Sequence, residues 1–570
     1  MTYSSKQNVN LLTAYLAAYG IEDAVVCPGS RNAPIVHNLN EHPGIRCHAV
    51  TDERSAGFYA LGIALKTAKP VAVCVTSGSA VLNLAPAVGE AKYRHVPLVV
   101  ISADRPAQWI GQLDGQTIDQ PNALRSSVRK VANLPEPTSE EEEWYCRRLI
   151  TETLHSATCH GGAPVHINVP ITEPLFDFTV NSLPTVKPIK YHRNNSDTPC
   201  WDYTPFAAQH KRHGKTADAT DYRTLVVIGQ TRPETIQLAT LGAIADRFVV
   251  FAEPLSVDAP VFRFDEAIRR IPQDDIDLYR PRHIVYVGDT IVSKVARKFL
   301  RDSHADVCMV THDASEVCDP LMGITDIVEC PTPDDVDQFL LSLCNAVEPM
   351  PRQQLEYISR WDALFTDADD RAATYRPVYS QMEAVRLFEQ TVESLTVPIH
   401  VHYANSNAVR LANIYADHYV WCNRGVNGIE GSLSTAAGFS LATDDTVAIV
   451  IGDLSFFYDQ NALWNQELRG NLRILLVNNS QGGIFRMLKG LDDSPAALPY
   501  ISAEHHTTAE GICRQHGIVY LTAYNSEDLA YNIQTLLECE SDHPVLLEVF
   551  TDANTDAAAY KEYLNSTQKL

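Results

Sequence analysis

The sequence lacks several features that would place it in other classes of protein. None of its 13 cysteines forms a Cys-x-x-Cys pair, which argues against a disulfide framework and against a zinc cluster. It contains no run of 18 apolar residues, and its first ten residues show no basic segment followed by an apolar one. We therefore expect no membrane span and no export signal, and we expect a cytoplasmic protein.

Positive charge is also scarce. The chain has 46 Lys and Arg against 70 Asp and Glu, a formal net charge of −24. Because nucleic-acid binding requires clustered cations, we expect no nucleic acid as the main partner, and an anionic ligand would need a local basic pocket. The 570 residues, 45% hydrophobic and 20% charged, are typical of a globular protein with several domains of roughly 100 to 200 residues each.

Short apolar runs followed by polar turns recur near both ends of the chain. In the first part the runs cover residues 24–27, 71–75 and 98–101; near the other end they cover 400–403, 447–451 and 474–477. Helix-length segments separate them, and this alternation predicts parallel sheets of the βαβ kind.

The two parts also agree in register. Adding 376 to the residue number carries Val25 to a valine, Ser30 to a serine, Ala60 to an alanine and Gly62 to a glycine. One offset that holds over about eighty residues predicts two copies of one doubly wound domain.

A third α/β unit is expected between the copies, because the apolar runs 225–228 and 284–287 each end at a glycine. A stretch rich in Pro, Asn, His and Lys, residues 184–220, is the expected linker before it. We therefore predict an α/β protein of three doubly wound parallel-sheet domains, with boundaries 1–185, 186–370 and 371–570.

Polar residues follow two of the predicted strands near the end of the chain. Gly452-Asp453-Leu454-Ser455 follows one strand, and Asn478-Asn479 follows the next, 26 positions after Asp453. In an open parallel sheet both points face the crevice where ligands bind. A carboxylate and an amide oxygen suit Mg²⁺ shared with a diphosphate, although a helix N-cap and turn-forming asparagines are the simpler explanation of each pair alone.

This spacing resembles the cofactor motif of the thiamine-diphosphate enzymes, and the rest of the chain resembles one branch of them. That branch is the menaquinone-pathway family of 2-succinyl-5-enolpyruvyl-6-hydroxy-3-cyclohexene-1-carboxylate synthases (the MenD family). Further motifs carry the likeness: Pro28-Gly29-Ser30-Arg31, Asp52-Glu53-Arg54, Val75-Thr76-Ser77-Gly78, Ala103-Asp104-Arg105-Pro106, Asn423-Arg424-Gly425 and Leu433-Ser434-Thr435-Ala436-Ala437-Gly438. Residues 190–365 resemble the family least.

The resemblance implies a cofactor site for thiamine diphosphate with Mg²⁺, or Mn²⁺ in its place. Asp453 and Asn479 would bind the metal by side chains and Gln481 by its backbone carbonyl. Glu53 would be the proton partner of the cofactor's aminopyrimidine, a role in general acid–base catalysis, although a surface ion pair would equally explain a lone Glu-Arg. The other implied cofactor contacts are Pro28, Gly29, Ser77, Gly78, Ile429, Leu454, Ser455 and Ile484.

Arginines in these motifs constrain the substrates, because guanidinium groups bind carboxylates in a planar, bidentate way. The family's substrates, 2-oxoglutarate and isochorismate, are both dicarboxylates. The implied substrate contacts are Ser30, Arg31, Arg105, Gln116, Lys294, Ser406, Arg410, Arg424, Ile484 and Phe485, of which Gln116 and Lys294, with Glu53, are the implied catalytic residues.

The resemblance has two departures and two rivals. Gly115 precedes Gln116 where the family carries an asparagine, and Val295 follows Lys294 where it carries an arginine.

The nearest alternative function is that of another thiamine-diphosphate decarboxylase or carboligase, such as an acetohydroxyacid synthase-like enzyme. A non-catalytic nucleotide-binding regulator is the other, because Gly229 and Gly288 end strands, yet neither belongs to a complete Gly-x-Gly-x-x-Gly motif. The resemblance further implies a homodimer or a homotetramer.

Overall fold

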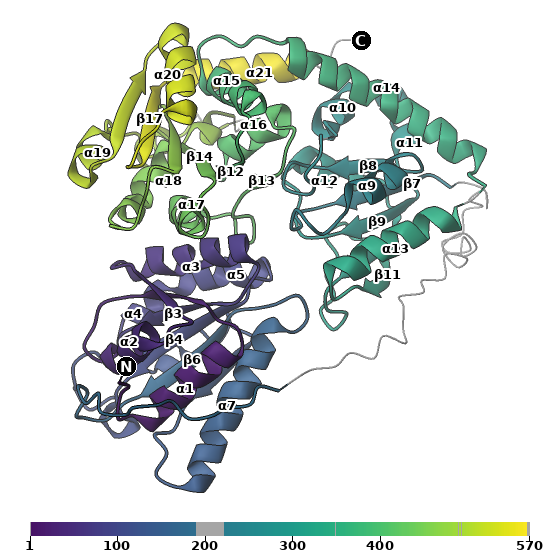
Figure 1. Cartoon of the computed structure of the whole chain (residues 1–570). Helices are drawn as coiled ribbons and strands as arrows, with labels where there is room; N and C mark the ends of the chain where they lie inside the picture. Colours follow the sequence, from purple (N-terminus) through teal and green to yellow (C-terminus); the bar gives the residue numbers. More distant parts are fainter. Residues whose placement is uncertain are drawn as a thin grey trace.

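The computed structural model describes residues 2–189, 222–260, 262–347, 349–487, 490–491 and 493–566. Within these residues the chain forms three parallel sheets, each covered by helices, and Figure 1 shows them as three separate bodies. The predicted fold class, three parallel-sheet α/β domains, is confirmed.

The first sheet has the strand order β2-β1-β3-β4-β6-β5. Its strands are β1 (Asp23–Val26), β2 (Arg46–Ala49), β3 (Val71–Val75), β4 (Leu98–Asp104), β5 (Lys130–Asn133) and β6 (Val165–Pro170). The helices are α1 (Gln7–Ala18), α2 (Ala33–Glu41), α3 (Glu53–Thr67), α4 (Ala80–Asn83), α5 (Ala85–Tyr93), α6 (Gln120–Ala123) and α7 (Glu140–Thr158). Every residue of β1, β3 and β4 is buried, which explains why these strands are visible in the sequence as continuous apolar runs.

The last sheet repeats this order as β13-β12-β14-β15-β17-β16. Its strands are β12 (Ile399–Tyr403), β13 (Val420–Trp421), β14 (Thr446–Gly452), β15 (Leu472–Asn478), β16 (Val519–Ala523) and β17 (Val545–Phe550). The helices are α15 (Gln381–Ser394), α16 (Asn407–Tyr415), α17 (Ser432–Leu441), α18 (Asp453–Tyr458), α19 (Glu510–His516), α20 (Ser526–Glu538) and α21 (Ala553–Ser566). Strand by strand, the first and last sheets therefore have one topology.

The middle sheet has five strands in the order β11-β10-β9-β7-β8. They are β7 (Thr224–Ile228), β8 (Val249–Ala252), β9 (His283–Val287), β10 (Asp306–Thr311) and β11 (Ile324–Glu329). The helices are α9 (Leu238–Ala245), α10 (Phe264–Arg270), α11 (Ile276–Tyr279), α12 (Lys294–Asp302), α13 (Pro333–Ala346) and the long α14 (Arg352–Thr374), which runs from the middle sheet towards the last one.

Helices α3 and α17 join the first and last domains (Figure 1). Both are buried along almost their whole length, as expected for helices that lie between two sheets. A Cβ added at Gly62 would lie 2.0 Å from the carbonyl oxygen of Thr435, and one at Gly438 would lie 2.2 Å from that of Tyr59. Only glycine permits this approach at either position, and these two glycines are the pair that the offset of 376 relates.

The middle domain is attached to the last domain by buried polar contacts. The Val420 N–H donates to the Pro254 carbonyl over 2.8 Å, and Arg263 donates to the carbonyl of Ile414 and to Asp417. Leu255 and Val292 belong to the hydrophobic core of the last domain. The loop after β8 and the start of α12 are therefore held against α16 and β13.

The predicted domain boundaries remain a prediction. Residues 190–221, which include most of the expected linker, lie outside the described residues. The boundary at 370/371 falls within the last turns of α14. Among the described residues, no helix has the length and apolar composition needed to cross a membrane.

Candidate active site

The sequence-predicted residues of the first domain lie at the carboxyl ends of four neighbouring strands. Pro28, Gly29, Ser30 and Arg31 follow β1, Glu53 follows β2, Ser77 and Gly78 follow β3, and Arg105 follows β4. Because β2, β1, β3 and β4 are adjacent in the sheet, these residues share one edge, which is where ligands bind in open α/β sheets.

Arg105 holds the loop that carries Gln116. Its Nε donates to the Gly115 carbonyl over 3.0 Å, and its Nη1 lies 3.0 Å from Asp114 Oδ2. Gln116 has a positive φ of 57°, and a Cβ at Gly78 would lie 3.0 Å from its Cα. The structure therefore brings Arg105, Gln116 and Gly78 together.

Arg31 is buried and engaged within its own domain. Its Nη1 donates to the Ile171 carbonyl over 3.0 Å, and its Nη2 lies 3.1 Å from Glu173 Oε1. These two contacts occupy part of the guanidinium group, so fewer of its N–H donors remain for a substrate carboxylate.

Glu53 is the first residue of α3 and is half-buried. Its Oε2 accepts from Asn83 Nδ2 over 3.2 Å. Its neighbours Asp52 and Arg54 contact Asn461 and Tyr458, respectively, which lie at and beyond the carboxyl end of α18. Asp453 is the first residue of that helix, and no contact among the described residues joins it to Glu53.

The last domain presents its predicted residues at the four equivalent strand ends. Ser406 follows β12, Arg424 follows β13, Asp453 follows β14, and Asn479 with Gln481 follows β15. Asp453 is 4% exposed, and its Oδ2 accepts from the N–H groups of both Asn479 and Gln481 over 3.1 Å. The structure therefore brings the three proposed metal ligands together.

The side chain of Asn479 leaves one buried oxygen without a partner. Its Nδ2 donates to Asp556 Oδ2 over 2.9 Å, whereas its Oδ1 is buried without a hydrogen bond. A buried acceptor without a donor costs free energy unless a ligand satisfies it. An amide oxygen beside a carboxylate is a donor set that Mg²⁺ or Mn²⁺ accepts, so the residues present fit a divalent cation.

Two arginines of the last domain have guanidinium N–H donors without a hydrogen-bond acceptor among the described residues. Arg410 on α16 makes no side-chain hydrogen bond or ion pair among the described residues, and it lines a small pocket with Asn407, Gly483 and Tyr560. Burial lowers the pKa of Arg410, and the charge of Arg424 lowers it further. Arg424 donates to Asn405 Oδ1 over 2.9 Å, and its buried Nε has no partner.

Lys294 begins α12 of the middle domain and is exposed. The buried carboxylate of Glu253 accepts from the N–H groups of Val292 and Ser293 over 2.6 and 2.9 Å. It also accepts from Asn413 Nδ2 on α16 over 3.0 Å. Because Asn413 lies three residues after Arg410, Glu253 fixes the start of α12 against the helix that carries Arg410.

For the remaining predicted residues of the last domain, no contact among the described residues defines a role. Leu454 and Ser455 form the first turn of α18, and Leu454 N–H donates to Asp453 Oδ1 over 2.7 Å. Ile429 is exposed, and Ile484 and Phe485 are half-buried in the turn Gly483–Met487.

Sequence reasoning missed four residues of this region. His505 Nε2 lies 3.3 Å from Asp453 Oδ2, Asp556 orients Asn479, Asn405 holds Arg424, and the charge of Arg297 on α12 contributes to lowering the pKa of Arg410. Asp556 is 77 residues from Asn479, so no local pattern points to it. Arg297 follows Lys294 by three residues, and that helical spacing is a signal that could have found it.

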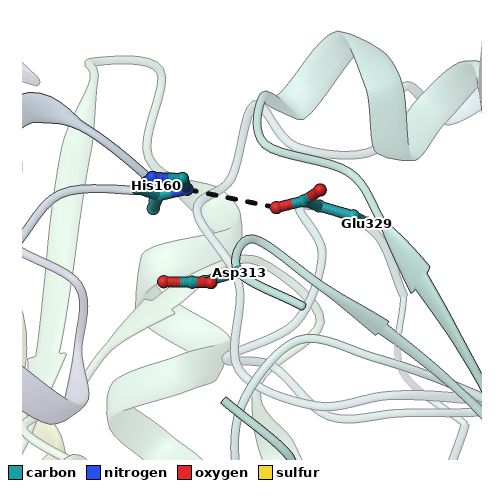
Figure 2. Close-up of side chains that lie close together, drawn as sticks. All are labelled: His160, Asp313 and Glu329. Atoms are coloured by element: carbon teal, nitrogen blue, oxygen red, sulfur yellow. Dashed lines mark ion pairs between the residues drawn. The ribbon is translucent and has the colours of Figure 1, made fainter. Parts of the chain in front are cut away.

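A separate group of potential metal ligands lies where the first and middle domains meet (Figure 2). His160 comes from the first domain, and Asp313 and Glu329 come from the middle domain; their ligand atoms lie within 4.8 Å of one another. His160 and Glu329 are exposed, and Asp313 already accepts from Ser315. We interpret the group as a surface ion pair between domains, outside the candidate active site.

Comparison with known proteins identifies the two related domains. The family described as thiamine pyrophosphate enzyme, N-terminal TPP binding domain, matches residues 7–123, and the corresponding C-terminal TPP binding domain matches residues 404–549. A 2-succinyl-5-enolpyruvyl-6-hydroxy-3-cyclohexene-1-carboxylate synthase of Bacteroides thetaiotaomicron is 41% identical and covers 100% of both chains. The chain belongs to this synthase family.

Two further members support the assignment. The synthase of Bacteroides fragilis is 40% identical over 98% of this chain and 99% of its own, and that of Phocaeicola vulgatus is 39% identical over 98% of each. The resemblance predicted from the motifs is confirmed, and with it a thiamine-diphosphate-dependent enzyme of menaquinone biosynthesis.

Proposed function

We propose that this synthase decarboxylates 2-oxoglutarate and joins the remaining four-carbon unit to the ring of isochorismate, forming the product named in its family. The observation that carries the proposal is the placement of Arg410 and Arg424, whose guanidinium groups have unused donors, on the sheet edge that also carries Asp453 and Asn479. An enzyme for two dicarboxylates needs such groups beside its cofactor.

The last domain would hold the diphosphate through a divalent cation, Mg²⁺ or Mn²⁺. Asp453 and Asn479 offer side-chain oxygens, and Gln481 offers its backbone carbonyl. The unpartnered Oδ1 of Asn479 supports this ligand set. The first turn of α18, with Leu454 and Ser455, lies beside these ligands and would face the diphosphate.

The first domain would contact the aminopyrimidine. Bound thiamine diphosphate supplies a carbon nucleophile for the keto group of a 2-oxoacid and stabilises the negative charge that remains when CO₂ leaves. Glu53 would hold a proton at the pyrimidine ring. Pro28, Gly29, Ser77, Gly78, Ile429 and Ile484 would enclose the cofactor.

Cations from all three domains would bind the substrates. Arg105 orders the Gln116 loop, Arg410 and Arg424 have donors available for carboxylates, and Lys294 comes from the middle domain. Ser30, Arg31, Ser406 and Phe485 complete the proposed substrate contacts. Arg31 would use the part of its guanidinium that Ile171 and Glu173 leave available.

We also propose a homodimer or homotetramer in which each site is shared by two chains. Among the described residues, the side-chain hydrogen bond of Glu53 goes to Asn83 of its own domain, and no contact joins Glu53 to Asp453. Exposed apolar side chains flank the strand ends of both domains, including Leu82 (47% exposed), Trp109 (52%), Val426 (51%) and Tyr458 (50%). A second copy would cover these side chains and supply the other half of the site.

A cytoplasmic location is part of the proposal. The 12 cysteines among the described residues are all free, which suits a reducing compartment. Eight of them are buried, where they pack as small apolar groups.

The test is to incubate the purified protein with thiamine diphosphate, Mg²⁺, 2-oxoglutarate and isochorismate and to identify the product by mass. The expected product carries the succinyl and enolpyruvyl groups on one ring. If CO₂ is released equally without isochorismate and pyruvate serves as well as 2-oxoglutarate, the acetohydroxyacid synthase-like alternative replaces the proposal.

A further inference from the structure

The last turn of α5, in the first domain, contacts the loop of the last domain that carries Arg424. Glu90 Oε1 accepts from the N–H of Gly425 over 2.8 Å, and its Oε2 accepts from the N–H of Val426 over 2.7 Å. Arg94, four residues later, donates from Nη1 to the Cys422 carbonyl over 2.5 Å. We call Glu90 and Arg94 the α5 clamp.

The α5 clamp is buried and closely fitted. Glu90 is 3% and Arg94 is 9% exposed. A Cβ at Gly425 would lie 2.8 Å from the Glu90 carbonyl oxygen and 3.1 Å from Arg94 Cγ, so the loop approaches α5 as closely as a glycine allows. Burial raises the pKa of Glu90, whereas Arg94 and the two N–H groups favour its charged form.

The middle domain contacts the same loop. Gln230, just after β7, donates from Nε2 to the Cys422 carbonyl over 2.9 Å. The Cys422 carbonyl therefore accepts from both of the other domains, so all three domains meet at this loop. Within the last domain, Asn405 donates to the carbonyls of Asn423 and Gly428 and accepts from Arg424.

We propose that Glu90 and Arg94 are positioning residues, which fix the loop from 422 to 428 so that the unused donors of Arg424 face a substrate carboxylate. Neither side chain would touch the substrate. This inference rests on the proposed function of Arg424 and adds the first domain as the source of its orientation.

The first measurement asks whether the clamp orders the loop, and it needs no substrate. Hydrogen exchange of the full chain is compared for the wild type, Glu90→Gln and Asp337→Asn. Asp337 is the matched control: the residue is 7% exposed, and its carboxylate accepts from Gln237 and Thr240 inside the middle domain. Glu90→Gln turns one acceptor into a donor that faces an N–H, so exchange across residues 422–428 should rise in that variant alone.

The second measurement asks whether the loop orders the binding site. Calorimetry on the protein loaded with thiamine diphosphate and Mg²⁺ uses glutarate, which has both carboxylates of 2-oxoglutarate but no reacting keto carbon. A charge-assisted hydrogen bond corresponds to a change of roughly 10- to 100-fold in affinity. We expect Glu90→Gln to weaken glutarate binding by that order while thiamine diphosphate affinity stays within about twofold of the wild type.

Arg94 supplies a second pair of variants should Glu90→Gln fold poorly. Arg94→Lys keeps a donor for the Cys422 carbonyl and should bind glutarate almost as the wild type does, whereas Arg94→Met should bind it more weakly. A merely structural residue would lower the melting temperature without this difference between Lys and Met.

The outcomes separate the inference from the proposed function. Unchanged loop exchange, or unchanged glutarate affinity in both Glu90→Gln and Arg94→Met, overturns the inference. Absence of glutarate binding by the wild type overturns it too, because Arg424 would then bind no such ligand. If the wild type binds glutarate and Glu90→Gln weakens it, but isochorismate gives no joined product, the inference stands and the proposed function fails.

Discussion

The first and last domains share one strand order and differ in the residues that follow their strands. Where β3 is followed by Ser77, the equivalent strand β14 is followed by Asp453; β4 is followed by Arg105, and β15 by Asn479. The sheet thus determines where functional side chains lie, and single residues after each strand determine which chemistry they perform. In the proposed site, one scaffold would present the proton partner in the first domain and the metal ligands in the last.

The arginines of the two domains also differ in the number of hydrogen bonds and ion pairs that they form within the protein. Arg31 and Arg105 each contact both a carbonyl and a carboxylate of their own domain. Among the described residues, neither Arg410 nor Arg424 forms an ion pair with a carboxylate, although the charge of Arg424 favours the charged form of Glu90 and Glu253. The first-domain arginines therefore order loops, and those of the last domain have donors left for ligands.

The largest expected effect concerns the proposed metal ligands of the last domain. Asp453→Ala should abolish retention of thiamine diphosphate, because the carboxylate that organises Asn479 and Gln481 is lost. Calorimetric titration with thiamine diphosphate at fixed Mg²⁺ measures this. Asp104→Asn is the control: Asp104 is equally buried at the end of β4, and its variant should keep its affinity within about twofold. Equal loss in both variants would show that the last domain has no special role.

The next largest effect concerns Glu53. Glu53→Gln keeps the shape of the side chain but removes the ionisable group, and loss of proton transfer costs ~10² to 10⁴ in rate. Turnover should therefore fall by that factor while cofactor affinity changes little. Exchange of the cofactor's C2 proton at the wild-type rate in this variant would remove Glu53 from catalysis.

A smaller effect is expected for the arginines of the last domain. Arg410→Lys and Arg424→Lys keep the charge but lose the planar pair of donors, a change worth roughly 1.5 to 3 kcal/mol, or about one to two decades in KM. Arg473→Lys, at the opposite end of β15, is the control. Steady-state kinetics with each substrate would contradict the prediction if all three variants matched the wild type.

The smallest effect is expected at the contact between α3 of the first domain and α17 of the last domain. Gly62→Ala and Gly438→Ala each place a methyl group against a backbone carbonyl, and overpacking of this kind costs about 1 to 3 kcal/mol. Both should lower the melting temperature by similar amounts. Gly242→Ala on α9, where a Cβ would meet nothing within 4 Å, should instead be neutral or slightly stabilising. Unequal effects at Gly62 and Gly438 would mean that the two helices are not equivalent.

The sequence was sufficient for the central strands β1, β3 and β4 of the first sheet and β12, β14 and β15 of the last, because buried parallel strands are continuous apolar runs and their ends are marked by polar turns. It did not predict the other three strands of either sheet, which are β2, β5, β6, β13, β16 and β17. It could not predict the contacts between domains. Glu90 and Gly425 are 335 residues apart, and Glu90 occurs in a helix with no motif around it. Arg31 shows the converse limit, since its motif predicts a substrate contact but says nothing of the ion pair with Glu173.

The contact between α3 and α17 has the form of an isologous interface. Residue 62 meets residue 435 and residue 438 meets residue 59. Subtracting 376 from 438 gives 62, and adding 376 to 59 gives 435, so the second pair is the first with the two domains exchanged. Such reciprocity is what a two-fold axis imposes on a dimer of identical subunits. The axis inside this chain therefore has the geometry of a homodimer whose two subunits have been fused. In the proposed assembly of two chains, four copies of one domain would surround the shared cofactors.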